Sequence, residues 1–117
     1  MSYWVYLEDE EGLPHLLDSA HQEGGTYAVG GTHECMMNVT YNYGHSFARF
    51  LDPNEGLRWL NDKTVSETIE RIEEACKFMP DEPSDNYWDS TIGNAGHVMH
   101  ILLSWARQFP NGIWRIH

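Results

Sequence analysis

The residues best suited to recognition are polar side chains that alternate along one short stretch of the chain. Asn38, Thr40 and Asn42 occupy every second position, and their amide and hydroxyl groups can both donate and accept hydrogen bonds. Such positions share one face of a β-strand, so the stretch predicts a row of groups that can read a polar ligand. Aromatic residues that could add flat stacking walls are Tyr41, Tyr43, Tyr87 and Trp88.

Glycine-containing motifs could complete a pocket around this row. Two Gly-Gly-Thr repeats start at Gly24 and Gly30 and allow close approach to the backbone. The motif Gly93-Asn94-Ala95-Gly96 opens a predicted helix, whose free N–H groups could hold an anion. Together these features predict a pocket for a small ring-bearing molecule, with or without a phosphate. Its candidate ligand-binding residues are Asn38, Thr40, Asn42, Tyr43, Trp88, Thr91 and Asn94. In the alternative interpretation the asparagines face solvent, the glycines only turn the chain and the aromatic residues belong to the core.

Two histidines offer a different chemistry. His97 and His100 are three residues apart on a predicted helix, so both imidazoles could face one point and bind a divalent ion of a hydrolase. Further ligands would have to come from elsewhere, such as His33, Glu34 or His45, and the spacing in the sequence does not supply them. The tight Cys and His spacing of a structural zinc site is absent. We therefore expect no metal and no other cofactor.

Nucleophilic catalysis has weaker support. There is no Gly-x-Ser-x-Gly motif. His33 and Cys35 would share one side of a strand, but a core cysteine is the simpler interpretation. The many carboxylates fall in predicted loops and on an exposed helix face, where they are hydrated. The sequence therefore predicts no catalytic residue.

The charge balance limits the partners. Asp and Glu number 18 against 7 Lys and Arg, a formal net charge of -11, which repels a phosphate backbone and excludes ordinary direct nucleic-acid binding. The same charge suits a cationic partner or a protein that imitates nucleic acid. The start of the chain has no basic signal region, no long apolar run suggests a membrane span, and two cysteines are too few for a disulfide framework. We expect a cytoplasmic protein without a membrane partner.

Four strands are predicted in the first half of the chain. Residues 3–7, an acidic turn at 8–12 and residues 13–17 have the pattern of a β-hairpin. A short strand is expected between residues 24 and 32. Residues 34–43 alternate cleanly, which predicts one strand whose core-facing residues are Cys35, Met37, Val39, Tyr41 and Tyr43.

Helices dominate the second half. A short helix is expected between Gly44 and Pro53. The capping-box sequence Thr64-Val65-Ser66-Glu67 predicts a helix that begins at Thr64. A more widely apolar, central helix begins near Gly93 and ends at Pro110, and residues 113–116 form a last strand. With 117 residues, the chain is predicted to be a single α+β domain over 1–117, with an antiparallel sheet of four to five strands and two main helices on one face.

Several segments together resemble a family of small hypothetical proteins from bacteriophages and bacterial genomes: residues 24–27, 38–43, 87–88, 93–96 and 102–106. The resemblance implies a phage-type accessory protein and transfers no catalytic residue. The polar row and the aromatic residues, without any catalytic motif, favour a non-enzymatic binder of a small polar ligand, which could be nucleotide-like, or of a host protein. The alternatives are the hydrolase based on His97 and His100 and the acidic nucleic-acid mimic. The sequence leaves the oligomeric state open.

Overall fold

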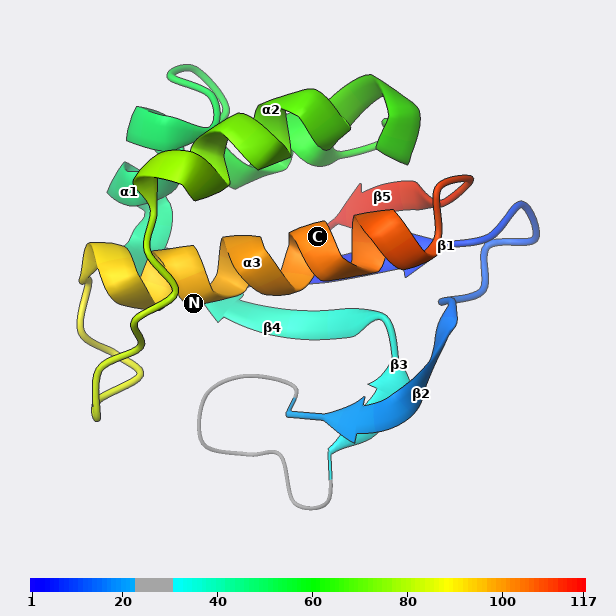
Figure 1. Cartoon of the computed structure of the whole chain (residues 1–117), viewed down its shortest axis with the longest axis horizontal. Coiled ribbons are helices and arrows are strands. Elements are labelled where there is room, and N and C mark those ends of the chain that lie inside the picture. Colours follow the sequence, from blue (N-terminus) through cyan, green and yellow to red (C-terminus); the bar gives the residue numbers. More distant parts are fainter. Residues whose placement is uncertain (23–30) are drawn as a thin grey trace.

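The computed structural model describes residues 1–22 and 31–117. Five strands and three α-helices follow one another in this part of the chain (Figure 1). They are β1 (Ser2–Glu8), β2 (Leu16–His21), β3 (Thr32–Glu34), β4 (Met36–Thr40), α1 (Gly44–Phe50), α2 (Val65–Phe78), α3 (Ile92–Gln108) and β5 (Ile113–Ile116). Two short 3-10 helices, Tyr41–Tyr43 and Gly56–Leu60, flank α1.

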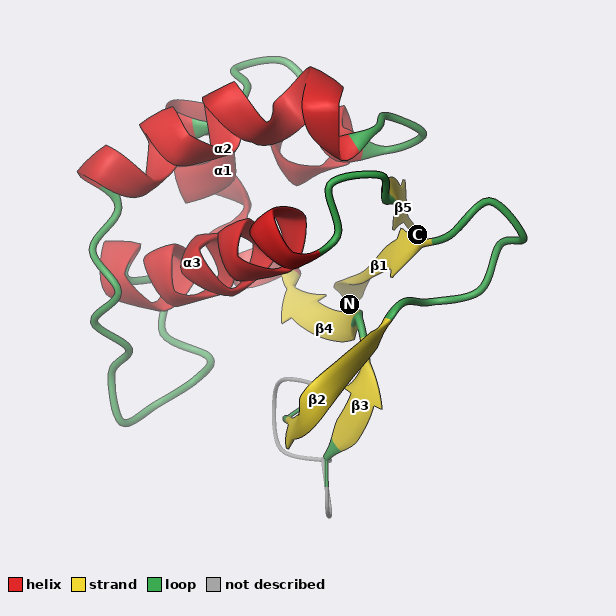
Figure 2. Cartoon of the chain, turned by 45° about the vertical axis from the view of Figure 1, so that its right-hand side comes forward, coloured by secondary structure: helices red, strands yellow, loops and turns green. Residues whose placement is uncertain are grey.

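The main sheet has three antiparallel strands in the order β4-β1-β5. Val5 of the central strand is paired with Met37 on one side and Ile116 on the other. The helices lie on one side of this sheet, with α3 nearest to it and α2 packed on α3 (Figures 1 and 2). Strand β1 alternates between buried and partly exposed residues, as expected for a sheet with one covered face.

The α+β class is confirmed, but the prediction of one sheet with four to five strands is wrong. Strand β2 pairs with β3 in a separate two-stranded sheet (Figure 2). The predicted hairpin between residues 3–7 and 13–17 is reduced to a single bridge between Glu8 and Pro14. Both edges of β1 are occupied by β4 and β5, so β2 cannot pair along β1. The strand predicted between residues 24 and 32 lies mostly outside the described residues.

The prediction of one strand over residues 34–43 is also corrected. The chain bends at Cys35, β4 covers only Met36–Thr40, and a 3-10 helix follows at Tyr41–Tyr43. The Thr40 hydroxyl accepts a hydrogen bond from the Asn42 backbone N–H at 3.2 Å, which turns the chain out of the strand. Of the five predicted core residues, only Tyr41 is exposed.

The helix predictions are confirmed. Thr64 caps α2 with a complete capping box, and α3 ends before Pro110. Helix α3 is the central helix, with most of its residues buried. The buried indole N–H of Trp114 donates to the Thr68 hydroxyl at 2.9 Å and ties β5 to α2. No helix in the described ranges is long and apolar enough to cross a membrane.

Candidate functional site

A cavity of about 490 Å³ opens beside strand β4, within the range usual for small-molecule sites. It lies between β4, the first half of α3, the end of β2 and the loop that joins α2 to α3, which we call the α2–α3 loop (residues 79–91). Its apolar and aromatic walls come from three of these segments and the nearby 3-10 helix: Met37, Tyr43, Pro83, Tyr87, Val98 and Ile101. Polar groups that border it are His21, Gln22, Asn38, Ser84, Asp85, Asn94 and His97.

Tyr87 fixes the α2–α3 loop to the outer edge of β4. Its hydroxyl accepts a hydrogen bond from the Thr40 backbone N–H at 3.0 Å and donates one to the Asn38 backbone carbonyl at 3.1 Å. The tyrosine hydroxyl thus takes the place of a neighbouring strand at this point of the sheet. The Tyr43 hydroxyl in turn donates to the Tyr87 backbone carbonyl. Burial raises the pKa of both tyrosines, so both hydroxyls remain protonated donors at neutral pH.

Asn94 holds the rest of the loop in place. The side chain is 4% exposed, and its amide oxygen accepts from the Ser84 backbone N–H at 2.7 Å. The amide nitrogen donates to the backbone carbonyls of Asn86 at 3.0 Å and Asp89 at 2.8 Å. The Thr91 hydroxyl accepts from the Asn94 backbone N–H at 3.0 Å and so caps α3. Both residues shape the wall of the cavity through these bonds.

The two glycines of the Gly93-Asn94-Ala95-Gly96 motif have a packing role. A Cβ atom at Gly93 would collide with the Glu82 carbonyl, and one at Gly96 would collide with the Pro80 carbonyl. The backbone of the α2–α3 loop therefore lies directly on the first turns of α3. This close approach explains the two glycines of the motif. The predicted helix end with free N–H groups for an anion does not.

The structure brings together only part of the predicted ligand-binding set. Asn38, Tyr43 and Asn94 border the cavity, whereas Thr40, Asn42, Trp88 and Thr91 do not. The predicted row on one strand face is not formed, because Asn42 lies in the 3-10 helix.

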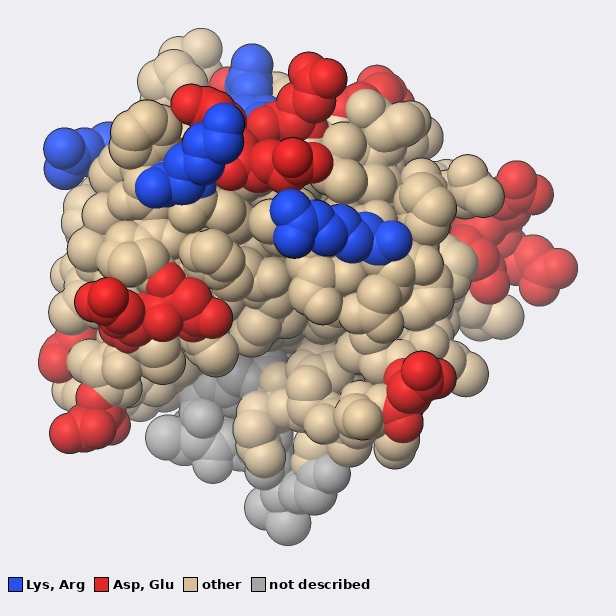
Figure 3. All heavy atoms as spheres, viewed as in Figure 1, with Lys and Arg blue, Asp and Glu red and all other residues tan. Residues whose placement is uncertain are grey.

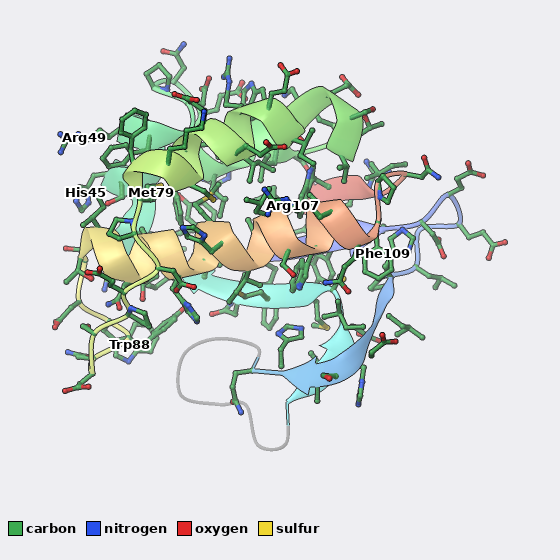
Figure 4. The ribbon with its side chains drawn as sticks, in the orientation of Figure 1. His45, Arg49, Met79, Trp88, Arg107 and Phe109 are labelled. Atoms are coloured by element: carbon green, nitrogen blue, oxygen red, sulfur yellow. The ribbon has the colours of Figure 1, made fainter. Side chains whose placement is uncertain are left out.

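The outlying residues bind other parts of the fold. The Asn42 amide donates to the Trp88 backbone carbonyl at 2.8 Å, and the Asn38 amide donates to the Ser2 hydroxyl at 2.7 Å. Trp88 is 42% exposed and lies on the α2–α3 loop, away from α3 (Figure 4). Most of the predicted amide groups are therefore engaged within the protein itself.

Several residues of the cavity were not predicted as ligand-binding. Val98 and Ile101 are three apart on α3 and present one face to the cavity together with His97. The wide apolar arc of this helix was the available signal, since it exceeds what packing on one neighbour requires. Ser84 and Asp85 come from the α2–α3 loop, which Asn94 holds in place. This loop also binds Asn38 through Tyr87 and Asn42 through Trp88, 49 and 46 residues away in the sequence, so no local pattern reveals its position.

The histidines and cysteines have separate surroundings. His97 Nδ1 lies 2.6 Å from the Asp81 carboxylate, and His100 Nε2 lies 2.9 Å from the Met79 backbone carbonyl. Within residues 1–22 and 31–117, no three His, Cys, Asp or Glu side chains are grouped as metal ligands. Cys35 is fully buried, and burial raises the pKa of its thiol to about 12. The His33 ring instead lies 3.1 Å from the Leu17 carbonyl.

The fold and the cavity together define an α+β domain with a preformed, ligand-sized pocket at the edge of its sheet. Comparison with known protein families, curated proteins and solved structures finds no match to this chain.

Proposed function

We propose that this chain is a non-enzymatic binding protein whose cavity beside β4 holds a small ring-bearing molecule. The observation that carries the proposal is the cavity itself: a volume of about 490 Å³ with mainly apolar walls and a few polar groups at its border. Ligand sites in proteins commonly combine such walls with a small number of polar groups that fix the orientation of the ligand. Tyr87, Val98 and Ile101 would contact the ring.

Hydrogen bonds that hold one wall of the cavity support binding. The α2–α3 loop is held by the Tyr87 hydroxyl on β4 and by the Asn94 amide on α3. A site that is already formed loses little conformational entropy when its ligand arrives. Gln22 and His97 can then supply hydrogen bonds to polar groups of the ligand.

The chemistry of the border favours binding over catalysis. The Ser84 hydroxyl donates to the Asn86 backbone carbonyl at 2.8 Å and so is not activated by a base. Cys35, which does not border the cavity, remains a thiol because burial raises its pKa. On the resemblance of its sequence motifs, the role we propose is that of a phage-type accessory protein that sequesters a small molecule in the cytoplasm.

A cavity-filling variant tests this proposal. Nucleobases, nucleosides and other ring-bearing compounds are screened for an increase in the melting temperature of the wild-type protein. Ile101→Trp places a large side chain in the cavity, and Ser104→Trp places the same side chain on an exposed position of the same helix outside it.

The proposal predicts that a stabilising compound acts on the wild type and on Ser104→Trp but not on Ile101→Trp. A compound present at about 100 times its Kd should stabilise the native state by about 2.7 kcal/mol. Circular dichroism confirms that both variants are folded. An equal response of the two tryptophan variants would place binding elsewhere and contradict the proposal.

A further inference from the structure

The charged side chains around the cavity carry negative charge. Among the described residues that border it, Asp85 is a carboxylate and none is Lys or Arg. The α2–α3 loop also carries Asp81, Glu82 and Asp89 and has no basic residue. Figure 3 shows acidic side chains gathered at the lower left, where this loop lies in Figure 1.

The cationic side chains of the chain are engaged elsewhere. Five of the seven Lys and Arg residues donate hydrogen bonds to groups that do not border the cavity. They are Arg58, Lys63, Arg71, Lys77 and Arg115. Arg49 stacks on Phe50 in α1, and Arg107 lies in the last turn of α3, at the other end of this helix from the α2–α3 loop (Figure 4). No Lys or Arg among the described residues borders the cavity, so an anionic ligand would meet only His21 and His97 as basic groups, and His97 Nδ1 already lies 2.6 Å from the Asp81 carboxylate.

The helix end near the cavity does not compensate for this. A free helix N-terminus attracts anions, but the carbonyl groups of Pro80 and Glu82 lie on the first turns of α3 at Gly96 and Gly93. The Thr91 hydroxyl already accepts from a backbone N–H of the first turn. The α2–α3 loop thus covers the first turns of α3, and the charged residue that this loop brings to the cavity is Asp85.

The aromatic groups complete a site for positive charge. The rings of Tyr43 and Tyr87 border the cavity with centroids 5.6 Å apart and an angle of 62° between their planes. Aromatic faces attract ammonium groups, and the attraction is stronger where water is excluded. Asp85, which also borders the cavity, adds a negative charge that attracts a cation.

We infer that the ligand of this cavity is an organic cation with an apolar or aromatic body and a protonated amine, not a phosphate ester or a carboxylate. This inference rests on the proposed function, because it assigns the chemical class of the ligand that the cavity binds. The sequence left open whether the ring-bearing ligand carries a phosphate, and this inference assigns the ligand a positive charge.

Three indoles that share one ring and differ in charge test the inference. Tryptamine is a cation, indole-3-acetamide is neutral and indole-3-acetate is an anion at neutral pH. Each is titrated into the wild-type protein while the NMR signals of the Val98 and Ile101 methyl groups are followed. Tryptamine should bind at least about tenfold more tightly than indole-3-acetate, and this ratio should fall as salt is raised from about 0.05 M to about 0.5 M.

Matched charge variants locate the effect. Asp85→Asn should lower the tryptamine to indole-3-acetate affinity ratio about threefold. Glu10→Gln removes the same charge from the exposed turn between β1 and β2, at the opposite end of the molecule (Figures 1 and 2), and should leave the ratio unchanged.

The outcomes separate the two proposals. Equal affinities for the three indoles, or tighter binding of indole-3-acetate, would overturn the cation inference while the cavity remains a binding site. Equal tryptamine to indole-3-acetate affinity ratios in Asp85→Asn and Glu10→Gln would overturn it as well. If none of the three indoles shifts the Val98 and Ile101 signals, the inference and the proposed function both fail for this class of ring.

Discussion

Replacing Tyr87 by phenylalanine removes one hydroxyl group and leaves the aromatic ring in place. In the native protein this hydroxyl accepts from the Thr40 N–H at 3.0 Å and donates to the Asn38 carbonyl at 3.1 Å. Thr40 is only 2% exposed, so water cannot easily replace the lost acceptor. The variant therefore leaves a buried backbone donor without a partner and opens the outer edge of β4.

The expected loss of stability follows from these two bonds. A buried donor left unpaired costs about 1–3 kcal/mol, and the lost bond to the carbonyl adds about 1 kcal/mol. Tyr87→Phe should thus lower the free energy of unfolding by about 2–4 kcal/mol. With a urea m-value of about 2 kcal/mol/M, the midpoint of urea unfolding should fall by about 1–2 M.

Tyr41→Phe is the matched control. The Tyr41 hydroxyl accepts one hydrogen bond, from the Arg58 guanidinium, at an exposed position, so its removal should cost less than about 0.5 kcal/mol. Urea unfolding followed by tryptophan fluorescence measures both variants. If Tyr87→Phe unfolds at the same urea concentration as Tyr41→Phe, the hydroxyl does not anchor the loop to β4 and the reasoning is refuted.

Three further predictions concern the packing of the same region and its titration. Gly96→Ala should lower the free energy of unfolding by about 1–3 kcal/mol despite the better helix propensity of alanine, because the new Cβ meets the Pro80 carbonyl; thermal unfolding that shows a stabilised variant would contradict this. Asn94→Asp should destabilise the protein by about 2–4 kcal/mol, measured by urea unfolding, because a carboxylate cannot donate to the two loop carbonyls; an unchanged midpoint would argue against the anchor. Burial raises the pKa of the Cys35 thiol from 9.0 to about 12, so the unfolded chain releases this proton above pH 9 while the native state keeps it. Stability should therefore fall between pH 9 and pH 12 by up to about 1.4 kcal/mol per pH unit from this group, and urea unfolding of Cys35→Ala should show a shallower pH dependence; the same slope in both proteins would contradict the assignment.

Elements with a local signal could be predicted from the sequence. The capping box at Thr64 and the proline after α3 act within a few residues of the helix ends, and both helices occur where these signals placed them. The last strand was predicted from its residue types and does join the sheet next to β1. For the two helices the deciding interaction lies close in sequence, whereas β5 has a local strand pattern but pairs with β1 at the other end of the chain.

Elements whose position depends on competition between strands far apart in the sequence could not be predicted. Strand β2 has a suitable composition for pairing with β1, yet β4 and β5 take both edges of that strand. The alternating pattern of residues 34–43 continues past Thr40, but a single side-chain cap there turns the chain into a 3-10 helix. The alternating pattern does not show which strands compete for the same edge. It also does not show where one local hydrogen bond ends a strand.

The candidate site shows the same difference between local signals, which the sequence carries, and long-range contacts, which it does not. The sequence shows polar residues at strand and helix ends, but their spacing does not tell whether an amide faces a ligand or the backbone. Asn94 binds the α2–α3 loop, and Asn38 reaches Ser2, 36 residues away in the sequence. The cavity arises between four segments brought together by long-range packing, so its lining becomes visible only in three dimensions.

Neighbouring methionines on β4 provide the most direct measurement. Met37 borders the cavity, whereas its neighbour Met36 does not. With methyl-labelled methionine and tryptamine as the probe, intermolecular NOEs identify which methyl group lies against the bound ring. We predict NOEs between the indole protons and the Met37 methyl group and none to the Met36 methyl group. NOEs to Met36 alone, or bound tryptamine without an NOE to Met37, would show that the cavity is not where the ligand binds.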